Sequence, residues 1–146
     1  MTPGVPAYAA AAAILGTELT VPEVAQTVIL TRAQAASTRM PESESLSRLA
    51  GSRATLVLHL AIRRTRALAA ELSLSYGEDC PVAVVSRASQ PAEVVLRGTL
   101  ADIADRVEAA GLRQAAVILV GEALRETPHG QLVESHLYGK RDRPER

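Results

Sequence analysis

Aromatic residues are scarce in this 146-residue sequence, which contains three tyrosines and no phenylalanine or tryptophan. Single-stranded nucleic acids and sugar rings are usually bound by stacking on aromatic side chains, so sites of that kind are nearly excluded. Net charge is lacking too, because 16 Lys and Arg offset 16 Asp and Glu. The chain therefore has no long-range attraction for DNA, RNA or anionic lipid, and we expect no nucleic-acid and no membrane partner.

Cysteine is limited to Cys80, which has no second cysteine with which to form an internal disulfide or a thiolate zinc site. We expect a small buried thiol without a catalytic role, in a cytoplasmic protein. The apolar stretch Ala7–Leu15 is shorter than the ~20 residues needed to cross a bilayer. No Lys or Arg precedes Arg32, so the stretch also lacks the basic start of a signal peptide. We interpret it as a buried or half-buried helix.

Apolar runs of strand type alternate with amphipathic stretches along a chain whose length suits one compact domain. The predicted strands are residues 28–30, 54–60, 81–86, 93–98 and 115–120. The predicted helices are 7–15, 62–74, 100–110 and a short one that contains Leu46 and Leu49 and ends near Gly51. Gly16 and Gly111 are predicted to end the helices that precede them. Thr99 or a neighbouring residue is predicted to cap the start of the helix over 100–110. The strands at 81–86 and 93–98 could pair as a hairpin. These features predict an α/β fold with a mixed five-stranded sheet flanked by helices, over residues 1–125, followed by a polar, flexible tail at 126–146.

Generic catalytic motifs are missing from the sequence. It contains no G-x-G-x-x-G, G-x-x-x-x-G-K-S/T, G-x-S-x-G or H-E-x-x-H pattern. His59, His129 and His136 are far apart and have no acidic partners at ligand spacing, so we expect no metal site. His59 is expected to be a partly buried, hydrogen-bonded histidine near the end of a strand.

Arginines stand beside the ends of predicted strands. Arg32 and Arg39 lie in or next to the polar segment after the first strand, and Arg87 follows the strand at 81–86. Loops at strand ends are where α/β proteins bind ligands, and the planar guanidinium suits carboxylates and phosphates. The alternative is that each is an ordinary solvated arginine. Arg63, Arg64 and Arg66 are expected to form the solvated face of a helix instead.

A series of short motifs is more specific than any of these features. In chain order they are T-P-G-V-P-A at 2–7, L-T-V-P at 19–22, T-R at 31–32, M-P-E at 40–42 with Glu44, A-T-L-V-L-H-L-A-I at 54–62, C-P-V-A-V-V at 80–85, R-A-S-Q-P at 87–91, R-G-T-L at 97–100 and A-V-I-L-V-G at 116–121. In this order and spacing they resemble the C-terminal half of the tetrapyrrole (corrin/porphyrin) methylase family. The resemblance covers about residues 2–124.

The resemblance implies methyl transfer from S-adenosyl-L-methionine to carbon C11 of a corrin precursor, precorrin-4 or cobalt-precorrin-4, in cobalamin biosynthesis. Family members have two α/β domains, hold the cofactor in the cleft between them, and are commonly homodimers. Such a transfer needs no metal and no covalent enzyme intermediate, so a site poor in catalytic motifs is expected. Alignment of the reacting atoms in a dry cleft supplies much of the catalysis.

Site residues follow from the matched positions. Leu60 occupies the place where a Met or Leu side chain lies against the cofactor, and Ala88 the place of a small residue that lets the backbone approach the nucleoside. The positions expected to contact the cofactor are Leu60, Ala61, Ala88, Gly98, Thr99 and Leu100. Those expected to face the substrate are Arg32 and, less directly, Arg39 and Met40.

The family's N-terminal half, with its glycine-rich loop, has no counterpart in this sequence. We therefore expect half of a methyltransferase, whose other half is supplied by another chain or has been lost. The alternative is a non-catalytic dimerisation or ligand-binding module. In either case an apolar surface would lack its partner, and self-association to a homo-oligomer is expected.

Overall fold

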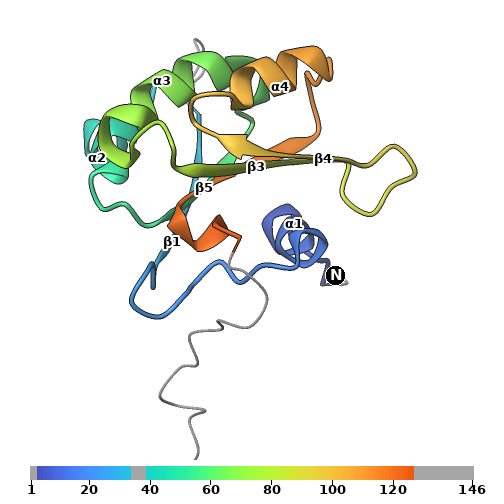
Figure 1. Ribbon diagram of the computed structural model, residues 1–146, viewed down its shortest axis with the longest axis horizontal. Coiled ribbons are helices and arrows are strands. Elements are labelled where there is room, and N and C mark those ends of the chain that lie inside the picture. The colour runs from blue at the N-terminus through green and yellow to red at the C-terminus, as the bar shows by residue number, and fades with distance from the viewer. Residues whose placement is uncertain (1–2, 34–38, 127–146) are drawn as a thin grey trace, which may run out of the picture.

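A five-stranded mixed sheet forms the centre of the computed structural model, which describes residues 3–33 and 39–126 (Figure 1). The predicted tail lies almost wholly outside the described residues. The strands are β1 (Val28–Arg32), β2 (Thr55–His59), β3 (Pro81–Ser86), β4 (Val94–Thr99) and β5 (Ala116–Val120). Their order across the sheet is β1-β2-β5-β3-β4.

Strand direction divides the sheet into two ends that matter for the site. β1 pairs with β2 in parallel, whereas β5 is antiparallel to both of its neighbours, β2 and β3. β3 therefore runs in the same direction as β1 and β2, and β4 returns antiparallel to it. We call the end at which β1, β2 and β3 finish the carboxyl end, and the opposite end the amino end. The predicted mixed sheet and the predicted hairpin of β3 and β4 are both confirmed.

Helices cover both faces of the sheet (Figure 1). α2 (Leu46–Ala50), α3 (Thr65–Tyr76) and α4 (Ile103–Ala109) lie on one face, and α1 (Ala7–Leu15) lies on the other. The described residues also include three short 3₁₀ helices: η1 (Glu42–Glu44), η2 (Ile62–Arg64) and η3 (Glu122–Leu124). Among the described residues, no helix has the length and apolar character required to span a lipid bilayer.

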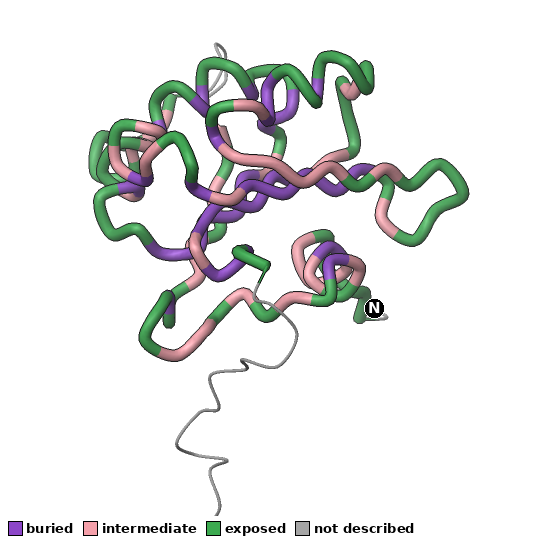
Figure 2. The backbone as a smooth tube through the Cα atoms, viewed as in Figure 1, coloured by how far each residue is buried: buried purple, intermediate pink, exposed green. Residues whose placement is uncertain are grey.

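Alternation along the central strands builds two apolar cores, because successive side chains of a strand point to opposite faces. The strand residues facing α2, α3 and α4 are Leu56, Leu58, Val82, Val84, Ile118 and Val120. Those in the core that contains α1 residues are Val57, Ala83, Val85, Val117 and Leu119. Figure 2 shows the resulting band of buried residues through the middle strands.

Two predicted helix starts are wrong. Ile62–Arg64 form η2, so α3 begins only at Thr65. Residues 100–102 form a turn, in which the Leu100 N–H donates to the carbonyl of Cys80 at 3.0 Å, and α4 begins only at Ile103. Thr99 is not the cap of that helix. Instead, the Thr99 N–H donates to Oδ1 of Asp102 at 2.7 Å.

The predicted helix ends at glycine are confirmed. Gly16 follows α1 with φ +62° and Gly111 follows α4 with φ +65°, both in the left-handed region that glycine adopts without steric cost.

Candidate functional site

Leu60, directly after β2 at the carboxyl end, combines strain with exposure. Its φ is +56° and its side chain is 74% exposed. A left-handed backbone costs a residue with a Cβ atom about 1–2 kcal/mol, and little burial offsets that cost here. The next residue, Ala61, is fully buried, and its carbonyl accepts a hydrogen bond from the Arg64 N–H at 2.9 Å. The chain thus turns sharply into the core while Leu60 stays in solvent, a pattern typical of functional sites.

Two neighbouring strands carry the same backbone feature at the same end. Arg87, after β3, has φ +50°, and Ala115, before β5, has φ +52°. The Ala115 carbonyl accepts hydrogen bonds from the Arg87 N–H at 2.8 Å and from the buried Ser86 hydroxyl at 3.2 Å. Because β2, β5 and β3 are adjacent, Leu60, Arg87 and Ala115 occupy one end of three neighbouring strands. Sequence reasoning missed Ala115, since no residue pattern signals a left-handed alanine.

Ala88 lies in the turn between β3 and β4, beside these residues. It is half-buried and packs against the core on the α1 side of the sheet. The following residue, Ser89, again has a positive φ of +61°, and its N–H donates to Oε2 of Glu93 at 2.6 Å. The structure therefore places Leu60, Ala61 and Ala88 at the carboxyl end, as three of the six predicted cofactor contacts.

Arg32 and His59 are direct neighbours at the carboxyl end. They are paired in the register of β1 and β2, and the His59 carbonyl accepts a hydrogen bond from the Ala33 N–H at 3.2 Å. Alternation places both side chains on the α1 side of the sheet, with Val57. Arg32 is exposed and His59 half-buried, and no described residue forms a hydrogen bond with the imidazole, contrary to our expectation.

Arg39 and Met40, the other predicted substrate residues, directly precede the segment that leads to η1. Arg39 is exposed and Met40 is half-buried. Residues 34–38, which connect them to β1, lie outside the described part of the chain. Their role toward the substrate stays a prediction.

Gly98, Thr99 and Leu100 lie at the amino end, away from the other predicted cofactor contacts. Thr99 pairs with Pro81, the first residue of β3, whereas Val94 pairs with Ser86. At about 3.3 Å per residue, the length of β4 separates the two ends by roughly 17 Å. The structure thus does not bring these three residues together with Leu60 and Ala88, and their assignment as cofactor contacts gains no support from this geometry.

Local packing gives Gly98 and Leu100 a structural explanation. A Cβ atom at position 98 would overlap the Asp102 carboxylate and lie 3.0 Å from Nε of Arg106. Arg106 donates to Oδ2 of Asp102 at 2.7 Å, and this bond, followed by that from the Thr99 N–H, holds the pKa of Asp102 below its usual value. Leu100 is buried in the core beneath α4.

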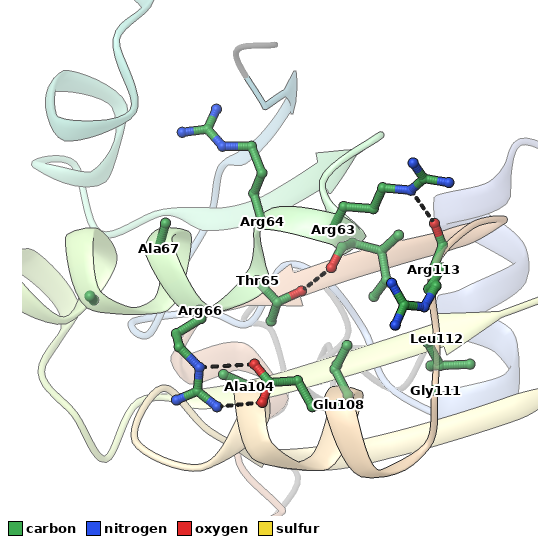
Figure 3. Close-up of a pocket in the computed structure, with 13 residues that line it drawn as sticks. Arg63, Arg64, Thr65, Arg66, Ala67, Ala104, Glu108, Gly111, Leu112 and Arg113 are labelled. Atoms are coloured by element: carbon green, nitrogen blue, oxygen red, sulfur yellow. Dashed lines mark hydrogen bonds and ion pairs between the residues drawn. The ribbon is translucent and has the colours of Figure 1, made fainter. Parts of the chain in front are cut away.

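A groove of about 680 Å³ opens between α3 and α4 (Figure 3). Small apolar residues such as Ala67 and Ala104 line its interior. On one side Arg66 binds Glu108 through two hydrogen bonds of 2.9 and 2.8 Å. On the other side Nε of Arg63 donates to the Arg113 carbonyl at 3.1 Å. A second groove of about 420 Å³ includes Gly98 and Thr99, and neither groove includes Leu60 or Ala88.

Side chains with nucleophilic or metal-binding chemistry do not gather at the carboxyl end. Cys80 is fully buried, and burial raises the pKa of its thiol to about 11. Over residues 3–33 and 39–126, no group of three His, Cys, Asp or Glu side chains is arranged to hold a metal ion. The features of the carboxyl end are therefore an exposed apolar residue, small residues, strained backbone and arginines.

Comparison with known proteins agrees with this architecture. Residues 1–104 match the family Tetrapyrrole (Corrin/Porphyrin) Methylases. The chain is 56% identical over 124 residues to a precorrin-4 C(11)-methyltransferase of Rhodococcus erythropolis, covering 85% of this chain and 50% of that protein. It is 46% identical over 123 residues to a cobalt-precorrin-4 C(11)-methyltransferase of Methanocaldococcus jannaschii, covering 84% and 47%.

A solved structure of the cobalamin biosynthetic enzyme cobalt precorrin-4 methyltransferase, CbiF, superposes with a TM-score of 0.81 at 41% identity, over 85% of this chain and 52% of that one. The chain thus spans about half the length of the relatives it matches. The family match covers most of the sequence, and the fold agrees with that of a family enzyme. The chain belongs to the tetrapyrrole (corrin/porphyrin) methylase family.

Proposed function

We propose that this chain forms the C-terminal half of an S-adenosyl-L-methionine-dependent methyltransferase that methylates C11 of precorrin-4 or cobalt-precorrin-4 in cobalamin biosynthesis. The identity to enzymes with these names, over half of their length, supports the proposal. The N-terminal half of the methylase would be supplied by another polypeptide segment. The single buried cysteine is consistent with a reducing, cytoplasmic location.

The observation that carries the proposal is the strained, exposed Leu60 at the carboxyl end of the sheet, where the half-buried Ala88 also lies, two strands away. Leu60 and Ala88 fit the cofactor, because an unburied apolar side chain and a small side chain offer van der Waals contact to a nucleoside and a thioether without competing charges. Ala61 is fully buried, so its side chain has no surface to offer to a ligand in this conformation. A family member, uroporphyrin-III C-methyltransferase from Thermus thermophilus, has been solved in complex with S-adenosylhomocysteine. It is 26% identical to this chain, with a TM-score of 0.66.

Binding and positioning are the tasks of this chain's residues in the reaction. When bound, the cofactor supplies an electrophilic methyl group on a sulfonium. Leu60 and Ala88 would contact it and exclude water, and Arg32 would hold a carboxylate of the substrate in the fixed orientation that methyl transfer requires. No acid, base or covalent nucleophile is needed from this half of the enzyme.

The partner half or a second copy would cover apolar surface that is exposed in this chain. Val5 and Leu30 are 77% and 49% exposed, and Leu30 lies on the edge strand β1. We propose that these residues become buried in a complex with the N-terminal half, in a homo-oligomer, or in both. Sedimentation of the isolated chain tests this, and a strictly monomeric chain over a wide concentration range would count against it.

The decisive experiment is reconstitution. The chain is mixed with the N-terminal half of the Rhodococcus relative, and methylation of precorrin-4 and cobalt-precorrin-4 is followed by mass spectrometry. We expect product only from the mixture, and less from a mixture containing Leu60→Ala. Failure of every pairing to form product, with both halves folded, would overturn the enzymatic proposal.

A second candidate function is a non-catalytic ligand-binding or dimerisation module, favoured by the half-length match to the relatives. Calorimetry with S-adenosylhomocysteine distinguishes the two. Half of a cleft should bind weakly alone and tightly once the N-terminal half is present. Affinity that does not change on adding the N-terminal half would favour the second candidate.

A further inference from the structure

Arginines without ion pairs gather at the carboxyl end of the sheet. Ion pairs between described residues engage Arg48, Arg66, Arg97, Arg106 and Arg125. None of the ion pairs within residues 3–33 and 39–126 engages Arg32, Arg63, Arg87 or Arg113, all of which are exposed. Arg32 is the last residue of β1, Arg63 lies in η2 after β2, Arg87 directly follows β3, and Arg113 lies in the segment before β5.

Hydrogen bonds hold three of these arginines around one short segment. The Arg113 carbonyl accepts from Nε of Arg63 at 3.1 Å, and two residues later the Ala115 carbonyl accepts from the Arg87 N–H at 2.8 Å. Figure 3 shows Arg63 extending toward Arg113, whereas Arg66 extends to Glu108. Arg32 lies two strands from β5, beside His59. From β1 to β3 the four span three strand spacings, or about 14 Å.

Negative charge is nearly absent from the same segments. Within residues 60–64, 87–93 and 111–115 the only carboxylate is that of Glu93, which already accepts the Ser89 N–H. Several guanidinium groups therefore share one end of the sheet without counter-charges from these segments. Exposed guanidinium groups without neighbouring carboxylates make the local potential positive and attract anions.

We propose that Arg63, Arg87 and Arg113, at the same end of the sheet as Arg32, bind peripheral carboxylates of the tetrapyrrole. The inference takes its ligand class, a polycarboxylate macrocycle, from the proposed function. The spread of the arginines over adjacent strands matches a ligand whose acid groups are distributed around a ring. The planar fork of each guanidinium suits one carboxylate. These residues are positioning residues, and the reacting carbon is not among their contacts.

The experiment measures binding of uroporphyrin, an octacarboxylate, and coproporphyrin, a tetracarboxylate, to the isolated chain by absorbance titration. The variants are Arg63→Gln, Arg113→Gln, Arg87→Gln and the double variant of Arg63 and Arg113. Arg53→Gln is the matched control, because Arg53 is exposed, has a φ of +54° like the +50° of Arg87, and lies before β2 at the amino end. No cofactor and no turnover are required.

We expect each of the three substitutions to weaken uroporphyrin binding about two- to fivefold, in line with partly solvated charge pairs, and the double variant to weaken it roughly tenfold. Coproporphyrin should bind more weakly than uroporphyrin, and the substitutions should reduce its affinity by a smaller factor. Arg53→Gln should bind both porphyrins like the parent chain. Equal losses in the control and the carboxyl-end variants would overturn the inference, as would no measurable uroporphyrin binding by the parent chain. Because the assay involves no methyl transfer, its result is independent of whether reconstitution yields an active enzyme.

Discussion

Replacing Leu60 with glycine should strengthen the fold and weaken the site at the same time. Relief of the left-handed strain should raise the free energy of unfolding by about 1–2 kcal/mol. Glycine also lowers the free energy of unfolding by about 0.4–1 kcal/mol, because it increases the conformational entropy of the unfolded chain. Since the leucine side chain is 74% exposed, little burial is lost. The net change in the free energy of unfolding should therefore lie between about zero and 1.5 kcal/mol in favour of the variant.

Leu74 provides the matched control for this substitution. It is 88% exposed, but it lies in α3 with ordinary helical geometry. Leu74→Gly should cost about 0.8–1 kcal/mol through helix propensity alone. Urea unfolding of both variants should thus differ by at least about 1 kcal/mol, or a few degrees in Tm for a chain of this size.

The second measurement is affinity for S-adenosylhomocysteine in the presence of the N-terminal half. Loss of a leucine side chain that becomes buried against the cofactor should weaken binding roughly tenfold in Leu60→Gly. Binding should not change in Leu74→Gly. If Leu60→Gly is as destabilising as Leu74→Gly, the account of backbone strain is refuted. If the variant gains stability and keeps full affinity, the location of the cofactor site is refuted.

Three further predictions concern the amino end and the core. Asp102 has a folded-state pKa below its unfolded value, so it adds stability above about pH 4 that is lost on further acidification. Asp102→Asn should therefore lower the free energy of unfolding at neutral pH by up to about 1 kcal/mol. Below about pH 4 its free energy of unfolding should fall less steeply with acidification than that of the parent chain, and equal slopes would contradict this. Gly98→Ala should lower the free energy of unfolding by about 1–3 kcal/mol, because its Cβ atom overlaps Asp102, and by much less when Asp102 is also replaced with alanine. Additive losses of stability in this double-mutant cycle would refute the packing explanation. Cys80, buried and with its pKa raised to about 11, should react with iodoacetamide at pH 8 only after unfolding, and fast labelling of the native chain would show that the thiol is accessible.

The strands of this fold were predictable because their apolar, β-branched runs differ sharply from the polar segments around them. Strand β3 was predicted at its observed bounds, and the hairpin with β4 followed from the short turn between them. Helix starts were less predictable, since Leu100 and Ile62 continue the apolar pattern of α4 and α3 but lie in a turn and in η2. Propensity and periodicity cannot show where a buried N–H finds its acceptor.

The site was predictable only in part. Family motifs singled out Leu60 and Ala88, and the structure places both at the carboxyl end. They also singled out Gly98, although the predicted hairpin of β3 and β4 already implies that Gly98, near the end of β4, lies at the opposite end of the sheet from Ala88. The strain at Ala115 has no counterpart in the sequence pattern, because an alanine carries no signal for a positive φ. The hydrogen bonds that its carbonyl accepts from Arg87 and Ser86 become visible only in the folded chain.

The last strand of the described residues, β5, is also the middle strand of the sheet, and this has a consequence for biosynthesis. Before Ala116 emerges from the ribosome, β1 with β2 and β3 with β4 are two separate pairs that have no hydrogen-bonded link. Two-stranded pieces are marginal in water, so neither pair has a lasting structure of its own. Insertion of β5 supplies both missing interfaces in one step. Folding of the nascent polypeptide must therefore wait for nearly all of the described sequence, and a stalled chain would leave two open apolar edges for chaperones or for other chains to occupy.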